Sequence, residues 1–235
     1  MLRTAALILA VLAVLAPAAP AVAQQSLSLN IGYFDVRSES GRVAGDTIVE
    51  NLWAPSPFAL GYRVSDFNNV TVGGEWLIPI GQFLEAGVGV GYYSEVVPSY
   101  YPELTYPDGS EITQSLKLRT VPITATARWI MTGKRAKVQP YIGAGVGIII
   151  WRYSESGAFA DPNLNVFNWD YTDDGTAVGP VIFGGLRVVA SRRVAIGGEL
   201  RYQYADAPLD ANVGFQGTRL DLGGMTYQAS VIFRF

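Results

Sequence analysis

Apolar and polar residues alternate along the chain in eight segments. The last of them, Leu222 to Phe235 (LGGMTYQASVIFRF), shows the alternation most clearly. One face carries Met225, Tyr227, Ala229, Val231, Phe233 and Phe235, and the other carries Gly224, Thr226, Gln228, Ser230, Ile232 and Arg234. A period of two is the spacing of a β-strand with one apolar and one mostly polar face. The pattern therefore predicts an extended strand in this segment.

Seven earlier segments alternate in the same way, and the connections between segments are by turns long and short. Their apolar faces carry Leu27, Leu29, Ile31 and Tyr33; Val70, Val72, Trp76 and Ile78; Ala86, Val88, Val90 and Tyr92; Val121, Ile123, Ala125, Ala127 and Trp129; Ile142, Ala144, Val146, Ile148 and Ile150; Val178, Ile182, Leu186 and Val188; and Val194, Ile196, Leu200, Tyr202 and Tyr204. Long loops are expected up to about Tyr62, after Tyr92, from Ser154 to Thr176 and from Ala205 to Leu220. In the first loop, Leu52, Trp53 and Phe58 indicate packing of the loop on itself. The run Phe58 to Val64 is either the upper half of the second strand or a separate short strand.

Rows of glycine indicate which face of the strands points inward. The polar faces of two strands read Glu85, Gly87, Gly89, Gly91 and Gly143, Gly145, Gly147. A soluble lipocalin-type barrel would turn these rows to water, where glycine only weakens a strand, whereas a narrow lumen needs small residues. The pattern thus favours an all-β fold, an eight-stranded antiparallel up-and-down transmembrane β-barrel with short periplasmic turns and long extracellular loops.

Composition agrees with a lipid-facing barrel. The 235 residues are 49% hydrophobic and 16% charged, yet beyond the N-terminus no uninterrupted apolar run is long enough for a membrane helix. Residues 1–23 have the parts of a secretory signal peptide: Arg3, an apolar run from Ala5 to Leu15, and Ala21-Val22-Ala23 as cleavage site. We expect removal of residues 1–23 and a single barrel domain of residues 24–235.

The inward register places seven charged side chains in the lumen. They are Glu75, Glu85, Arg128, Arg187, Glu199, Arg201 and Arg234. Because an unpaired buried charge is costly, these side chains are expected to pair and to plug the tube. Two alternatives are a gate, in which partners exchange, and a ligand-binding lumen.

Aromatic residues near the strand ends predict two interfacial girdles. Trp76, Trp129 and Phe233 are expected at the periplasmic ends, and Tyr33, Tyr92, Tyr202 and Tyr204 towards the outer ends. Further aromatics in the loops, such as Tyr101, Phe159 and Trp169, are expected either to fold the loops into a cap or to form a contact surface for a partner.

The absence of two residue types limits the catalytic and metal-binding sites that the chain can form. The chain has no His and no Cys, so it lacks the usual imidazole base of hydrolases and the usual zinc or copper ligands, and we expect no enzyme, no metal site and no cofactor. The acidic run Asp170 to Gly175 has the composition of a calcium loop without EF-hand spacing, which leaves weak surface binding of divalent cations open. A net charge of −3 argues against a nucleic-acid partner.

The pattern resembles the small eight-stranded outer-membrane barrels of the OmpA, OmpX and OmpW kind. The most specific pieces are VGGEW at 72–76, PYIGAGVG at 140–147, GGELRY at 197–202 and the final Phe235. The resemblance implies a monomer in the bacterial outer membrane, in contact with outer-membrane lipid and lipopolysaccharide. It also implies insertion by the barrel-assembly machinery, which would read Tyr227, Val231, Phe233 and Phe235 in the last strand.

Members of that family serve as envelope anchors, adhesins or narrow channels, so the fold does not settle the role. The first interpretation is a non-enzymatic barrel with a structural or surface-interaction role and a lumen plugged by charged side chains. The alternative is a narrow, OmpW-like channel for small, mainly apolar solutes.

Overall fold

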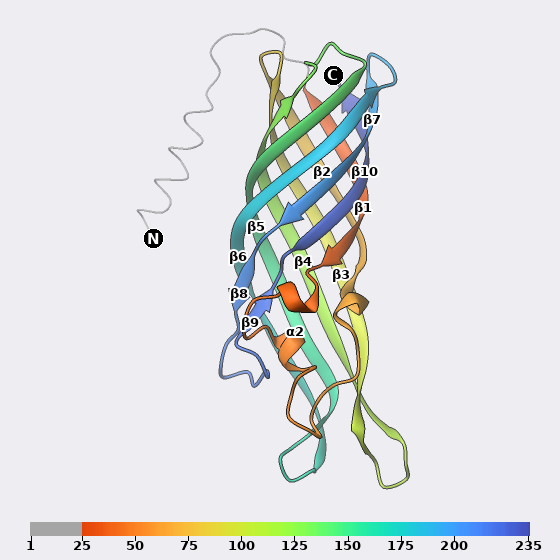
Figure 1. The fold of residues 1–235 in the computed structure, drawn as a ribbon, viewed down its shortest axis with the longest axis vertical. Helices are drawn as coiled ribbons and strands as arrows, with labels where there is room; N and C mark the ends of the chain where they lie inside the picture. The colour runs from red at the N-terminus through yellow and green to blue at the C-terminus, as the bar shows by residue number, and fades with distance from the viewer. Residues whose placement is uncertain (1–24) are drawn as a thin grey trace, which may run out of the picture.

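A computed structural model describes residues 25–235, so the expected signal peptide lies outside the described residues. Within them, eight antiparallel strands close a barrel in the order β1-β10-β7-β6-β5-β4-β3-β2, as Figure 1 shows. The strands are β1 (Ser26–Val36), β2 (Asn69–Ile80), β3 (Leu84–Thr105), β4 (Glu111–Ile130), β5 (Val138–Ala160), β6 (Val166–Val189), β7 (Val194–Gln203) and β10 (Gly224–Arg234). A separate pair, β8 (Asp206–Pro208) and β9 (Arg219–Asp221), lies in the last long connection. The predicted fold is thus confirmed.

The first and last strands seal the ring. β1 and β10 pair without interruption from Ser26 opposite Arg234 to Val36 opposite Gly224. This pairing leaves no open sheet edge at the point of closure, and open edges are what a spanning barrel has to avoid.

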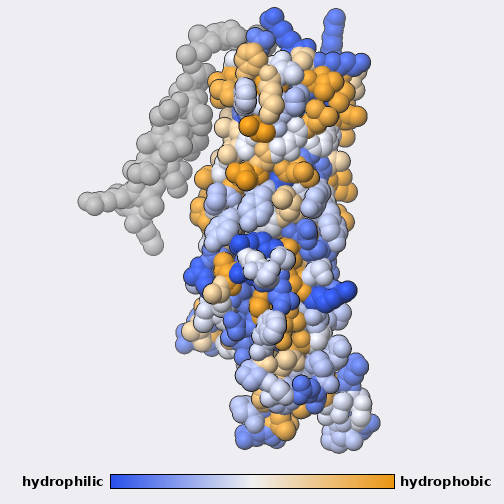
Figure 2. Space-filling view, in the orientation of Figure 1, coloured by the Kyte–Doolittle hydropathy of each residue, from blue (hydrophilic) through white to orange (hydrophobic). Residues whose placement is uncertain are grey.

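The predicted orientation of the strand faces is also observed. The apolar residues of the alternating segments form the outer surface, where Val88, Ile142 and Val178 are 49% to 68% exposed, while Gly87, Gly89 and Gly147 are buried inside. On β5 the outer apolar row runs from Val138 to Ile150, which is about 40 Å along a strand and about 30 Å along the barrel axis at a tilt of about 40°. That height matches the hydrocarbon core of a bilayer. In Figure 2 the hydrophobic colour gathers over the half of the molecule that carries the short turns.

No helix within residues 25–235 is long and apolar enough to cross a membrane.

Four neighbouring strands, β3 to β6, continue far beyond this belt (Figure 1). The extracellular loop boundaries predicted after Tyr92 and from Ser154 to Thr176 are therefore wrong, because only 106–110 and 161–165 connect the strands there. The physical reason is that the alternation continues outside the membrane with inverted polarity. On β4, Val121 and Ile123 face outward, whereas Leu116 and Leu118 of the extension are buried inside.

The first connection folds into the mouth formed by these extensions. It contains η1 (Glu39–Gly41), α2 (Thr47–Glu50) and η2 (Val64–Phe67), and its Ile48 and Phe67 are completely buried. Of the residues expected to pack within this loop, Leu52 is partly buried against the core, whereas Trp53 is 70% exposed and its indole Nε1 donates a hydrogen bond of 3.0 Å to Glu39 Oε1 of the same connection. The run Phe58 to Val64 is not a strand, since only Gly61 forms a single bridge, with Tyr100.

Candidate functional site: a lumen closed at two levels

The first closure is a layer of ion pairs in the membrane-spanning part of the lumen. Glu75 of β2 contacts the Arg128 guanidinium of β4 and accepts a hydrogen bond of 2.7 Å from Thr126 Oγ1. Arg201 Nη2 of β7 lies 3.6 Å from Glu75 Oε2. All these carboxylate and guanidinium groups are largely buried, so each charge is balanced inside the tube.

Glu199 extends the layer across β7 and β10. Its Oε1 accepts hydrogen bonds from Arg201 Nε at 2.9 Å and from Gln228 Nε2 at 2.8 Å. Its Oε2 accepts a bond of 3.0 Å from the Tyr141 hydroxyl of β5. Glu199 thereby joins three strands that surround the lumen.

A second pair lies nearer the short turns. Arg187 donates to both carboxylate oxygens of Glu85, at 3.1 and 3.2 Å, and its Nε donates to Gln139 Oε1 at 2.7 Å. Arg234, which was expected to pair as well, takes part in no ion pair among residues 25–235. Its charged neighbours are Arg187 and Glu85, and Glu85 is already engaged by Arg187, so the half-buried Arg234 relies on solvent.

Glycine residues and aromatic rings of the barrel wall position the charged side chains of the lumen. A Cβ added at Gly87 would collide with the Glu75 carboxylate and with Thr126 Oγ1, so a larger residue there would displace this hydrogen-bonded pair. On the opposite wall, the Phe183 ring lies 5.2 Å from Arg128 Cζ and 5.1 Å from Arg201 Cζ. Such ring contacts stabilise guanidinium groups that have lost water.

The second closure is an apolar core in the extracellular half. It joins inward residues of the strand extensions, such as Leu116 and Ile149, to Ile48 and Phe67 of the first connection. Phe34 and Tyr93 meet edge to face at 5.1 Å between ring centroids. This core fills the mouth of the barrel with side chains.

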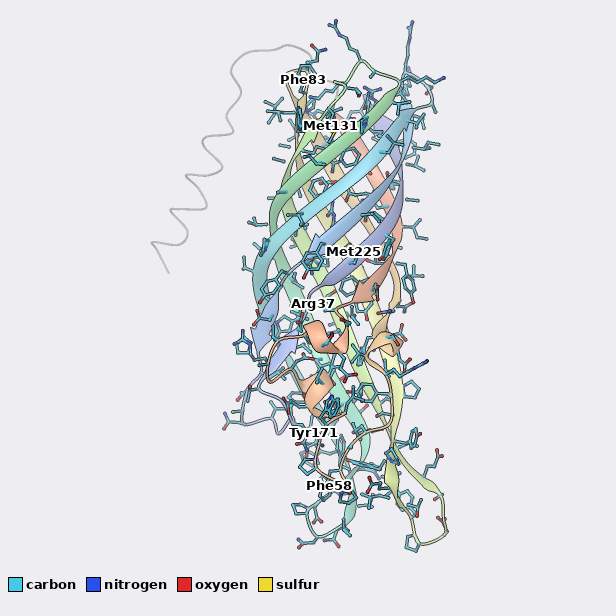
Figure 3. The ribbon with its side chains drawn as sticks, viewed as in Figure 1. Arg37, Phe58, Phe83, Met131, Tyr171 and Met225 are labelled. Carbon is cyan, nitrogen blue, oxygen red and sulfur yellow. The ribbon has the colours of Figure 1, made fainter. Side chains whose placement is uncertain are left out.

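A buried polar network fastens the first connection to the last one. Arg42 Nε donates to Asp46 Oδ2 at 2.5 Å, and its Nη2 donates to the Asp221 carbonyl oxygen at 2.8 Å. The Asp221 amide in turn donates to Asp46 Oδ1 at 2.7 Å. Arg37, labelled in Figure 3, forms an ion pair of 3.0 Å with Asp221. Sequence reasoning missed this network, because its partners are separated by more than 170 residues.

Glu155, in the extension of β5, is a buried carboxyl group that forms no ion pair within the part of the chain that the structure describes. Its Oε1 accepts hydrogen bonds from Asn51 Nδ2 at 2.6 Å and from the Tyr153 hydroxyl at 2.9 Å. Loss of hydration raises the pKa of Glu155 to about 7, although both hydrogen bonds act to lower it. The group thus ties the first connection to the barrel wall at a point outside the membrane belt.

A small chamber remains between the two closures. It is lined by Glu75 and Arg201 below and by Gly73, Gly91 and Thr124 on the walls, and its volume is about 70 Å³. This is room for a few water molecules but far below the roughly 300 to 1,000 Å³ of small-molecule sites. An open groove of about 710 Å³ lies outside the barrel, between the first connection and the ends of β1 and β10.

The predicted girdle residues lie on the outer surface. Trp76 and Phe233 both face Leu27 in register, and Trp129 faces Leu84, all near the short turns. The opposite end of the belt carries the four predicted tyrosines, Tyr33, Tyr92, Tyr202 and Tyr204. One of them, Tyr202, also lines the open groove. Of the residues expected to guide assembly, Tyr227 faces Tyr33, and Val231, Phe233 and Phe235 follow on the same outer face.

Among residues 25–235, no group of three or more Asp or Glu side chains is placed to hold a metal ion.

A closed ring of eight antiparallel strands with an apolar outer belt and a polar, filled lumen is the architecture of an integral outer-membrane β-barrel. Neither a family model nor a curated protein matches the chain. Among solved structures it is similar to the outer membrane protein OprG from Pseudomonas aeruginosa, with 9% identity, a TM-score of 0.53, and coverage of 91% of this chain and 96% of that one. It is also similar to Neisserial surface protein A, with 12% identity, a TM-score of 0.48, and coverage of 90% and 97%. At 9% identity the likeness to OprG shows the fold alone.

Proposed function

We propose that this protein is a non-enzymatic, non-conducting outer-membrane barrel that holds a rigid extracellular surface in place. The observation that carries the proposal is the closure of the lumen at two independent levels. Below, Glu75, Arg128 and Glu199 belong to one ion-paired layer, and above, the first connection fills the mouth with apolar side chains. A solute would have to displace both layers to pass.

The extensions of β3 to β6 supply the surface. They reach from the belt to the ends of the two hairpins, and they are joined from strand to strand, so they form a stiff curved sheet rather than mobile loops. Adhesive and structural roles need such a surface, whereas a passage through the barrel does not need it.

Planar-bilayer conductance of the purified protein tests the proposal. We expect no discrete current steps from the wild type. Removing one layer at a time, with Glu75→Ala and Arg128→Ala together or with 43–60 replaced by a short Gly-Ser linker, should also give no steps, because the other layer remains. Steady discrete steps from the wild-type protein would contradict a closed lumen.

The alternative function is a narrow channel for small, mainly apolar solutes. The observation that favours a channel is the small chamber beside Arg201, because it shows that side chains do not fill the lumen completely. Steps in the wild type, together with faster uptake of small apolar solutes into vesicles that contain it, would support this alternative.

A further inference from the structure

Three exposed cations lie on the outer surface where β4 and β5 leave the apolar belt. Lys117, Arg119 and Arg152 all point away from the lumen. Among the described residues, none of the three takes part in an ion pair or a side-chain hydrogen bond. Most other arginines outside the lumen, such as Arg37 and Arg63, have a carboxylate partner.

Two of these cations stand directly opposite each other. Arg119 of β4 and Arg152 of β5 are register partners, so their Cβ atoms are about 5 Å apart on the same face. Like charges in this arrangement repel and destabilise the sheet. Asp174 faces Arg152 from β6, and Asp170 lies nearby, but neither forms an ion pair with the two guanidinium groups. An anion held between the two arginines would remove the repulsion.

The surface around the pair is hollowed on both sides. One hollow, of about 220 Å³, adds the hydroxyl-bearing Ser154 and Thr172 to the three cations. The other, of about 230 Å³, reaches from the two arginines down to Val121 and Ile150. One hollow therefore offers hydrogen-bond donors and three cations beside one carboxylate, Asp170, and the other offers an apolar floor beside Asp174.

The position in the fold fixes the kind of anion. Val121 and Ile150 are two residues nearer the membrane than Arg119 and Arg152 on the same outer face, which is about 7 Å along a strand. They are the last members of the apolar belt on their strands, so the arginines lie at the level of the lipid headgroups. A ligand that contacts both the arginines and the apolar residues below them carries acyl chains attached to a phosphate.

From this arrangement we propose that Arg119 and Arg152, assisted by Lys117, bind a phosphate group of an outer-leaflet lipid whose acyl chains lie against Val121 and Ile150. Arginine suits this role because its planar group donates two parallel hydrogen bonds to phosphate oxygens. Asp170 lines the first hollow and Asp174 the second, so the negative charge beside the cations disfavours an extended polyanion over a single phosphate.

The test uses the full-length mature protein in mild detergent, with lipid A that carries two phosphates as the probe. Native mass spectrometry measures how much lipid A stays bound to the barrel. The Arg119→Gln/Arg152→Gln variant should retain about tenfold less than wild type, since two charge-assisted contacts are lost. The control variant Arg135→Gln/Lys137→Gln removes the same charge from the exposed turn at the opposite end and should retain lipid A as wild type does.

Two further arms separate the lipid from its headgroup. Lipid A freed of its phosphates should bind wild type no better than it binds the double variant, and inorganic phosphate at equal concentration should not displace bound lipid A. Because both arginines are exposed, heat-modifiable gel migration of the variant should match that of wild type and exclude misfolding as the cause. Equal retention by wild type and variant, equal binding of the phosphate-free lipid, or displacement by inorganic phosphate alone would each overturn the proposal.

Discussion

Lowering the pH should stabilise the docking of the first connection on the barrel, because the buried carboxyl group of Glu155 is protonated more readily in the docked state. In the docked state the pKa of this carboxyl is about 7, and once the connection lifts away and water reaches the group it returns to its ordinary value of 4.5. Between these two pH values the docked state binds one proton more than the open state. The docked state is therefore favoured fully below pH 4.5, and that contribution is lost as the pH rises to 7.

The size of the effect follows from the difference between the two pKa values. A difference of 7 minus 4.5 corresponds to about 3 kcal/mol, or about 300-fold in the opening equilibrium. Other titratable groups near Glu155 do not reverse the direction of this pH dependence. Burial raises the pKa of Asp46 as well, which adds to the same trend, and Tyr62 and Tyr153 keep their protons because their pKa values are raised far above neutrality.

Hydrogen exchange at the backbone amides of 46–53, corrected for the intrinsic pH dependence of exchange, measures the opening. We expect stronger protection at pH 5 than at pH 8 in the wild type. In Glu155→Gln, a neutral side chain of the same shape still accepts the bonds from Asn51 and Tyr153, so protection should be high at both pH values. Wild-type protection that is the same at pH 5 and pH 8, or a variant with an unchanged pH dependence, would refute the reasoning.

Three further substitutions, one of them with a matched control, probe the two closures. Glu199→Ala leaves Arg201, Gln228 and Tyr141 without their acceptor and should destabilise the barrel by about 3 kcal/mol, seen as a lower transition temperature in heat-modifiable migration; resistance equal to wild type would show that the ion-paired layer contributes little. Gly145→Ala should prevent or weaken folding, because its Cβ would collide with the Ala125 carbonyl oxygen, whereas Gly184→Ala, with its nearest atoms at 3.7 Å, should fold normally in the same gel assay. Ile48→Ala should weaken docking of the first connection by about 2 to 4 kcal/mol and speed its cleavage by thermolysin while the barrel stays heat-resistant; unchanged cleavage would mean that Ile48 does not hold it.

The inward and outward faces of the strands could be predicted because they depend only on the alternation of neighbouring residues in the sequence. The ion-pair partners could not, since they depend on the stagger of strands around the ring. Glu85 and Arg128 stand side by side in the β3–β4 register, yet Glu85 binds Arg187 and Arg128 binds Glu75. The lumen is narrow enough for long side chains to reach across it, so adjacency in the sheet does not decide the pairing.

The docking of the first connection was missed for a different reason, and the sequence did contain a signal for it. Along β4, the apolar positions move from the outer face at Val121 to the inner face at Leu116 and Leu118 without any change in the pleat. An outer apolar face is stable only against lipid, and an inner apolar face outside the membrane is stable only when another segment covers it. The inversion therefore marks where the strand leaves the bilayer and also requires a cover, and the cover had to come from a connection with apolar residues of its own, such as Ile48 and Phe67.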